Sequence, residues 1–329
     1  MLILSRKEGR LANRIILFAH FIANARSNNY TILNPSFEEY MEYFSVTSGN
    51  ICSTYPAKTE KNKHAGHEAK RSRTKSMKIS TTSHTISYIV GRSQNFRDRI
   101  IRSTNFIFKK ILYTTIYNSI RIIAYIGFTS SKYHAVINND DEEFNLNNPN
   151  LQKLIKEKKF VFIRGWLNRD FENVERYSTE IRDYFRPQKK FQETVDNFIN
   201  NIRGQGDILI GIHIRRGDYK LFRGGLFFYK NEIYKRFMQS IVEEYPQKDV
   251  QFMICSDESL NYDDFSGFSI TFGLNHELLD LYSLAQCDYI LGPPSTYTMW
   301  ASYYGRVPLF MISDPKSDVS MQNFSIKTL

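Results

Sequence analysis

Cysteine is scarce in this sequence of 329 residues, which contains only Cys52, Cys255 and Cys287. Three scattered cysteines are too few for a disulfide framework and lack the paired spacing of a zinc site. Cys255 and Cys287 lie in apolar stretches, where a free cysteine usually acts as a small buried hydrophobe. We therefore expect free thiols in a reducing compartment.

Long apolar runs are also missing, since none reaches the roughly 18–20 residues that cross a bilayer. The opening residues, MLILSRKEGR, contain three apolar residues after Met1 before charge begins. A secretory signal needs a longer apolar region than this. The sequence therefore predicts a cytoplasmic protein.

Acidic residues are scarce between positions 58 and 110, where fourteen Lys and Arg accompany three Asp and Glu. The net charge of the whole chain is +10, so this segment carries the positive excess. Such uneven charge predicts a surface role for one segment rather than a globally basic protein. Residues 96–128 are aromatic, β-branched and basic, and as a helix they would be amphipathic. That helix would either pack on a sheet or contact a membrane surface.

Apolar strand patterns alternate with helical patterns along much of the chain. Residues 2–25 predict a short strand, a loop and a long helix, and residues 30–37 predict a second strand closed by Pro35. The other predicted strands are 160–166, 208–214, 250–256, 288–292 and 307–312. The predicted helices among the later strands are 229–245, 275–287 and 296–304. This alternation predicts parallel sheets with flanking helices, an α/β fold.

The pattern is interrupted at NIRGQGD, residues 201–207, by two glycines and several polar residues. A chain of this length can form two domains, each with its own core. We therefore expect an N-terminal domain over 1–203 and a C-terminal domain over 204–329. The first would carry a basic insertion over about 56–128, which begins with a stretch rich in Lys, Ser, Thr and His.

Polar residues gather where three predicted strands of the second half end. They are Arg215, Arg216, Asp218, Ser256, Asp257, Ser295 and Thr296. Parallel strands end at one edge of their sheet, so we expect these side chains to lie together. Guanidinium groups, hydroxyls and a helix N-terminus form an anion site suited to a nucleotide diphosphate without a metal. Taken singly, each group could equally be a solvated strand edge or a helix cap.

Four blocks of the sequence carry a family resemblance. GIHIRRGDY (211–219) resembles the H-x-R-R-x-D motif of the α1,2-, α1,6- and protein O-fucosyltransferase superfamily, most closely the α1,2-fucosyltransferases of glycosyltransferase family 11. EGRLANRIILFA (8–19) is similar to the N-terminal G-R-L-G-N-Q motif of that family, with Arg14 in place of its Gln. ICSDES (254–259) and LLDLYSLAQCDYILGPPSTYTMWASYYG (278–305) are similar to its two later blocks.

The resemblance implies a GT-B-like α/β fold, with two Rossmann-like domains around a central cleft. It also implies inverting, metal-independent transfer of L-fucose from GDP-fucose to a glycan hydroxyl. Arg216 becomes the first choice for stabilising the leaving diphosphate, and Asn13 the catalytic residue that faces the sugar across the cleft. The other donor-binding candidates are Gly9, Arg10, His213, Arg215, Asp218, Ser256, Asp257, Ser295 and Thr296.

The general base that an inverting transfer usually uses is not assigned by these motifs. Asp218, His276 and Glu277 are the candidates, and a weakly base-assisted route stays open. We expect no cofactor and no metal.

The expected acceptor is a surface-polysaccharide or oligosaccharide glycan joined through an α1,2 linkage. It could be lipid-linked, with the basic region 58–128 holding the enzyme at the inner face of a membrane. One alternative is a GT-B transferase that uses another nucleotide sugar. The other is a nucleic-acid-binding protein acting through 58–110, which would leave the polar strand ends unexplained. We therefore expect no nucleic-acid partner.

Overall fold

The computed structural model describes residues 1–50, 52–57, 134–139 and 142–329, with eight helical positions between Ile111 and Ile122. Most of the expected basic insertion lies outside these residues. The nucleic-acid interpretation of 58–110 falls wholly outside them. Within the described part of the chain, no helix has both the length and the apolar character to cross a membrane.

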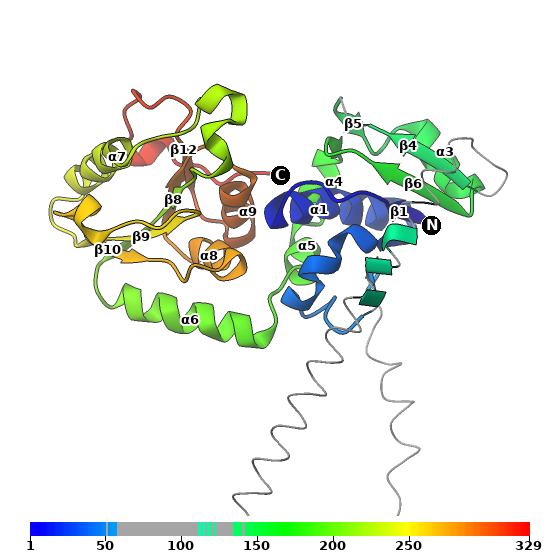
Figure 1. Ribbon diagram of the computed structural model, residues 1–329, viewed down its shortest axis with the longest axis horizontal. Helices are drawn as coiled ribbons and strands as arrows, with labels where there is room; N and C mark the ends of the chain where they lie inside the picture. The colour runs from blue at the N-terminus through cyan, green and yellow to red at the C-terminus, as the bar shows by residue number, and fades with distance from the viewer. Residues whose placement is uncertain are drawn as a thin grey trace, which may run out of the picture.

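The chain forms two lobes, each built on a five-stranded sheet (Figure 1). The sheet of the N-terminal lobe has the order β3-β2-β1-β6-β4, with β3 antiparallel at its edge and the other strands parallel. Its strands are β1 (Leu2–Leu4), β2 (Ile32–Asn34), β3 (Ser53–Tyr55), β4 (His134–Asn138) and β6 (Phe160–Arg164). A separate parallel pair joins β5 (Phe144–Asn145) and β7 (Asn168–Arg169).

The sheet of the C-terminal lobe is wholly parallel, with the order β10-β9-β8-β11-β12. Its strands are β8 (Ile208–Ile214), β9 (Val250–Ser256), β10 (Ser269–Phe272), β11 (Tyr289–Gly292) and β12 (Leu309–Met311). The predicted strands 208–214 and 250–256 are confirmed with the same bounds. β8 pairs with both β9 and β11, so the three strands with polar ends are neighbours, as expected.

Helices cover both sheets, and the α/β prediction is confirmed. Those before β8 are α1 (Leu11–Asn28), η1 (Pro35–Tyr43), α3 (Pro149–Glu157), α4 (Phe171–Arg176), α5 (Ser178–Tyr184) and α6 (Lys189–Arg203). Those after it are η4 (Asp218–Lys220), η5 (Phe222–Gly225), α7 (Asn231–Glu244), η6 (Tyr262–Phe265), α8 (Glu277–Leu284), α9 (Thr296–Gly305) and η7 (Met321–Asn323). The division at 203/204 stays a prediction.

The strand predicted over 30–37 is too long. β2 ends at Asn34, and Pro35 begins the 3₁₀ helix η1. Proline has no N–H to donate to a strand ladder, but its fixed φ suits the first position of a helix.

The two faces of the C-terminal sheet pack against different helices, because successive side chains of a strand point in opposite directions. The even-numbered residues of β8 pack in one core with α7 and are Ile208, Ile210, Ile212 and Ile214. Leu209 packs in the other core, which includes residues of α8 and α9. His213 lies on that second side, since its ring stacks on Tyr297 of α9. If the alternation continues past the end of β8, odd-numbered residues face α9 and even-numbered residues face α7.

The helix α1 is buried on nearly all sides rather than along one stripe. Figure 1 shows it between the lobes, where it contacts α4 and α5 of the N-terminal lobe and α9 of the C-terminal lobe. Phe18 of α1, Phe185 and Trp300 of α9 belong to one continuous apolar core. The core therefore runs from one lobe into the other.

Candidate functional site

A cavity of about 830 Å³ lies where the loops of both lobes meet. Ten of the eleven predicted site residues line it, and they are Gly9, Arg10, Asn13, His213, Arg215, Asp218, Ser256, Asp257, Ser295 and Thr296. They come from the loop before α1 and its first turn, from the ends of β8 and β9 and the residues just after them, and from the start of α9. The structure thus brings together side chains that are nearly three hundred positions apart in the sequence, and their roles stay predictions.

Arg216 is the predicted site residue that does not line the cavity. Its guanidinium donates a hydrogen bond to the side chain of Asn231, at the start of α7. It also lies near the buried Tyr234 of α7 and helps to set the charge environment of that hydroxyl. Arg216 continues the even-numbered face of β8, whereas Arg215 continues the face of His213. Of the two adjacent arginines, Arg215 is therefore the one that lines the cavity, and both roles stay predictions.

Arg215 is held between two carboxylates. Its Nη2 lies 2.7 Å from Oδ1 of Asp218, and its Nη1 lies 3.3 Å from Oδ2 of Asp257. Asp257 also accepts the backbone N–H of Arg216 at 2.8 Å. These contacts fix the planar guanidinium at the cavity wall, where it can present its remaining N–H groups to an anion. Asp218 and Asp257 thus position Arg215.

His213 is buried beside Arg215, and its ring stacks on Tyr297 with centroids 4.9 Å apart. Burial and the nearby Arg215 lower the pKa of His213 to about 3, so the imidazole is neutral. Its Nδ1 has no hydrogen-bond partner among the described residues. A buried polar atom without a partner is costly.

The N-terminus of α9 points its backbone N–H groups toward the same cavity. Ser295 caps the helix, and its Oγ accepts the backbone N–H of Tyr297 at 3.2 Å. Thr296 donates its hydroxyl hydrogen to Oδ1 of Asn13, in the first turn of α1. That bond joins the lobes across the cavity. A helix N-terminus of this kind favours a phosphate group.

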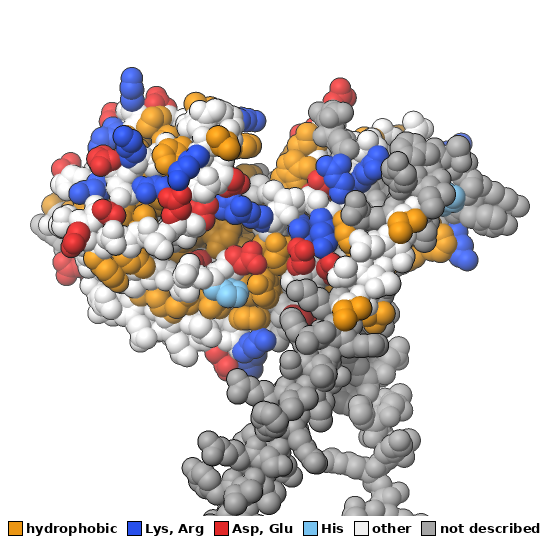
Figure 2. Space-filling view, in the orientation of Figure 1, with side chains coloured by type: hydrophobic (Ala, Val, Ile, Leu, Met, Phe, Trp, Pro, Cys, Tyr) orange, Lys and Arg blue, Asp and Glu red, His pale blue; other side chains and the backbone are white. Residues whose placement is uncertain are grey.

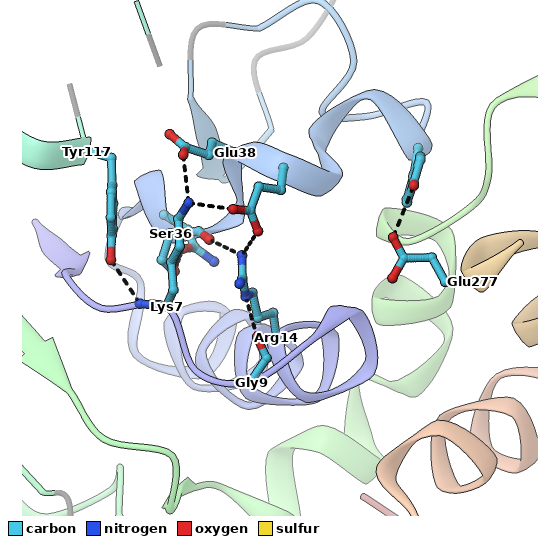
Figure 3. A network of polar contacts seen from close by, with 10 residues as sticks. Lys7, Gly9, Arg14, Ser36, Glu38, Tyr117 and Glu277 are labelled. Carbon is cyan, nitrogen blue, oxygen red and sulfur yellow. Dashed lines mark hydrogen bonds and ion pairs between the residues drawn. The ribbon is translucent and has the colours of Figure 1, made fainter. Parts of the chain in front are cut away.

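The loop before α1 is fixed by a charged network (Figure 3). Arg14 donates from Nε to the carbonyl oxygen of Gly9 at 3.0 Å and from Nη1 to Glu39 at 2.7 Å. Lys7 contacts Glu38 and Glu39, each at 2.7 Å. Gly9 itself has φ of 62°, and a Cβ there would lie 2.0 Å from the Asn13 amide nitrogen. The turn that presents Asn13 therefore requires glycine.

Sequence reasoning missed Asp280, which lines the cavity from α8. Its Oδ1 accepts the backbone N–H of Leu274 at 2.6 Å, and burial raises the pKa of the carboxyl to about 6. Among the described residues, no Lys or Arg forms an ion pair with it. A single acid inside the apolar run LLDLYSL was the available signal, because an acid on a buried face is unusual.

The candidate bases each have another partner. His276 caps α8, accepting the backbone N–H of Leu278 at its Nδ1 at 3.2 Å. Glu277 accepts the hydroxyl of Tyr43 from the N-terminal lobe at 3.1 Å. Asp218 is paired with Arg215. The general base stays unassigned. In the described part of the chain, no three His, Cys, Asp or Glu side chains gather as metal ligands, and metal independence stays a prediction.

Two lobes with parallel sheets, meeting at a cavity, define a GT-B-like α/β fold, as the motifs implied. A mutant of Arabidopsis thaliana FUT1 in complex with GDP aligns with 98% of this chain and 73% of its own, at 12% identity and a TM-score of 0.51. POFUT1 in complex with GDP aligns with 92% of this chain and 93% of its own, at 13% identity and a TM-score of 0.47. At 12% identity, the likeness to FUT1 establishes the fold alone. No family model and no curated protein matches the sequence.

Proposed function

We propose that the chain is an inverting fucosyltransferase that moves L-fucose from GDP-fucose to a hydroxyl of a glycan. The observation that carries this proposal is the convergence on one cavity of nine predicted donor-binding residues together with Asn13, the predicted catalytic residue. The fold adds support, because the FUT1 structure that shares it was solved with GDP. Assignment to the α1,2-fucosyltransferase family rests on the four sequence motifs.

The donor's diphosphate would bind between Arg215 and the N-terminus of α9. Positive charge at the β-phosphate stabilises the charge that develops as the bond to fucose breaks. Arg215 suits this task, because Asp218 and Asp257 fix its orientation before the donor binds. Such preorganisation avoids a reorganisation cost during the reaction. Asn13, anchored to Thr296, would face the sugar from the other lobe.

The guanosine would bind toward His213 and Asp280. A carboxylate can accept both the N1–H and the 2-amino hydrogen of guanine, which other common bases do not present together. Asp280 is a buried carboxylate on the cavity wall, so it suits this role. The neutral imidazole of His213 also lines the cavity and suits packing against the ribose or the base.

In the transfer itself, the acceptor hydroxyl oxygen bonds to C1 of fucose as the bond between C1 and the phosphate oxygen breaks. GDP leaves with the electron pair, and the hydroxyl proton passes to solvent or to a cavity carboxylate. We propose an α1,2 linkage and a surface-polysaccharide or oligosaccharide acceptor, since the motifs most resemble the α1,2 family.

A donor screen tests this assignment. We expect GDP release from GDP-fucose in the presence of EDTA, with transfer seen as a product heavier by one deoxyhexose by mass spectrometry. UDP-sugars should give none, because a guanine-reading carboxylate has no matching pair of donors in uracil. Release from GDP-mannose but not from GDP-fucose would assign a different nucleotide sugar. Activity lost in EDTA and restored by a divalent ion would contradict metal independence.

We also propose that the enzyme works at the inner face of a membrane. The segment 58–110 is strongly basic, and basic residues near anionic lipid contribute about 1 kcal/mol each. The helical positions Ile111 and Ile122 are 61% and 57% exposed. Tyr117 ties this helix to the N-terminal lobe, because its hydroxyl accepts the backbone N–H of Lys7 at 3.2 Å.

Liposome flotation tests the membrane proposal. We expect binding to vesicles that contain phosphatidylserine, weakened by salt and by the double substitution Ile111→Ser with Ile122→Ser. Screening of charge explains the salt effect, and loss of buried apolar area explains the substitution. Ile326→Ser is the matched control, because Ile326 is also exposed but lies near the C-terminus. Equal recovery with neutral and anionic vesicles would contradict the proposal.

A further inference from the structure

The cavity extends to an aromatic side chain that the donor proposal does not use. Trp166 follows β6 of the N-terminal lobe and lines the cavity together with Arg10 and Asn13. The chain has two tryptophans, and the other, Trp300, is completely buried in the core. Trp166 is therefore the tryptophan that a ligand in the cavity can reach.

The backbone and one neighbour hold Trp166 in place. Gly165 has φ of 118°, and a Cβ there would lie 2.1 Å from the backbone oxygen of Asn139. Arg169 donates from Nη1 to the Trp166 carbonyl oxygen at 2.6 Å, and its Cζ lies 4.5 Å from the indole ring centroid. This cation–π contact covers one part of the ring. The indole is thus a fixed surface, and little conformational entropy is lost when a ligand packs on it.

A second aromatic surface comes from the other lobe. Phe222 of η5 lines the cavity, and its ring stacks on Tyr219 with centroids 5.3 Å apart. Tyr219 donates its hydroxyl hydrogen to the carbonyl oxygen of Pro294 at 2.6 Å, which ties the pair to the loop before α9. Phe222 remains 47% exposed. Figure 2 shows hydrophobic side chains on both sides of the groove between the lobes.

We propose that Trp166 is the platform for a pyranose ring of the acceptor, with Phe222 as a second aromatic contact. This inference rests on the proposed function. A sugar ring has a rim of hydroxyls and a face of C–H groups, so it can lie on an aromatic ring without giving up hydrogen bonds. The charged side chains around Arg215 would bind the diphosphate of the donor. Trp166 and Phe222 are then available to contact the uncharged sugar rings of the acceptor.

The acceptor platform can be tested through tryptophan fluorescence. The probes are the methyl glycosides of glucose, galactose, mannose and N-acetylglucosamine, each titrated into protein saturated with GDP. We expect at least one of them to change the emission of the wild type, and no change in Trp166→Phe, because Trp300 is buried. No change with any glycoside while GDP still binds would overturn the inference. Quenching of Trp166 by GDP alone would also overturn it, since the ring would then serve the base.

Steady-state kinetics give a second test, with the best accepting glycoside as substrate. Trp166→Ala should raise the KM for this glycoside by about tenfold, because the variant loses the free energy of one aromatic contact and of the apolar area it buries. The kcat should change by less than about threefold. Trp166→Phe should recover part of the loss. Phe171→Ala is the matched control, because Phe171 is an exposed aromatic of the same lobe that does not line the cavity. An unchanged KM in Trp166→Ala would contradict the platform.

Failure of the platform and failure of the proposed function give different results. If the wild type does not bind GDP in calorimetry, the proposed function fails. If GDP binds and GDP-fucose is turned over, but Trp166→Ala transfers to the glycoside like the wild type, the platform fails alone.

Discussion

Replacing Arg215 with alanine should lower fucose transfer by about a hundredfold to a thousandfold, the usual cost of losing one charge-stabilising donor. The same change should weaken GDP binding, because Asp218 and Asp257 would then face the diphosphate without their cation. Calorimetry with GDP and rates of GDP release from GDP-fucose measure the two effects. Arg215→Lys should rescue binding more than rate, because lysine keeps the charge but lacks the planar fork.

The adjacent arginine is the matched control. Arg216→Ala should leave GDP affinity within about twofold, because its guanidinium bonds to Asn231 beside α7 and does not line the cavity. It should instead lower the free energy of unfolding by about 1 kcal/mol, the typical worth of a hydrogen bond. Equal losses of GDP affinity in the two variants would contradict the geometry. A loss confined to Arg216→Ala would restore the interpretation made from the sequence.

Replacing Asp280 with asparagine should weaken GDP binding by about tenfold to a hundredfold, since an amide would present N–H groups to the N–H groups of guanine. Inosine diphosphate provides the control ligand, because its base lacks the 2-amino group. The wild type should prefer GDP to inosine diphosphate, and Asp280→Asn should lose most of that preference. A preference that survives the substitution would place the guanine elsewhere in the cavity.

The raised pKa of Asp280 also predicts a pH dependence. Its carboxyl titrates at about 6 in the folded chain, against an ordinary value of 3.8. Protonation would remove the acceptor for guanine, so GDP affinity should fall as pH drops below about 6. The phosphate of GDP also titrates near pH 6. The informative quantity is therefore the difference between the profiles of the wild type and Asp280→Asn. Identical profiles would contradict the assignment.

The same pKa predicts a stability effect of opposite sign. The folded chain holds the Asp280 proton more tightly than the unfolded chain, so ionisation costs stability as pH rises from about 4 to about 6. Above that window the cost is fully present. Asp280→Asn should therefore be more stable than the wild type at pH 7.5, with a free energy of unfolding higher by up to about 3 kcal/mol and a higher unfolding temperature. A variant that is less stable at pH 7.5 but binds GDP normally would indicate a structural role.

The central strands of the C-terminal sheet were predictable because β8 and β9 are largely apolar, and burial on both faces leaves that pattern in the sequence. β10 was not predicted, because Ser269–Phe272 is short and only partly buried at the sheet edge. In the N-terminal lobe, β3 and β4 were not predicted either. Both are edge strands, β3 is Ser-Thr-Tyr and β4 is only partly buried, so neither leaves an apolar run in the sequence.

The site was predictable at strand ends and less so elsewhere. The sequence places Arg215 and Arg216 side by side, but it does not say which face of β8 meets the cavity. Arg216 is even-numbered, like Ile210, Ile212 and Ile214, so it is expected on the same side of the sheet as these residues. Only the packed structure shows that this side is covered by α7. Trp166 and Asp280 come from elements that the strand-end argument did not consider. Asp280 left a signal as a single acid in an apolar run, whereas the place of Trp166 at the cavity follows from the packing of the lobes.

The burial of α1 between the lobes has a consequence for modularity. In an enzyme with two lobes, a chimera can be designed by exchanging one half to change the donor or the acceptor. Here α1 completes the apolar core of its own lobe and also packs on α9 of the other. Its first turn carries Asn13, which bonds to Thr296. An exchanged C-terminal half would have to match that helix face as well as the new ligand, so the unit that can be swapped includes α1.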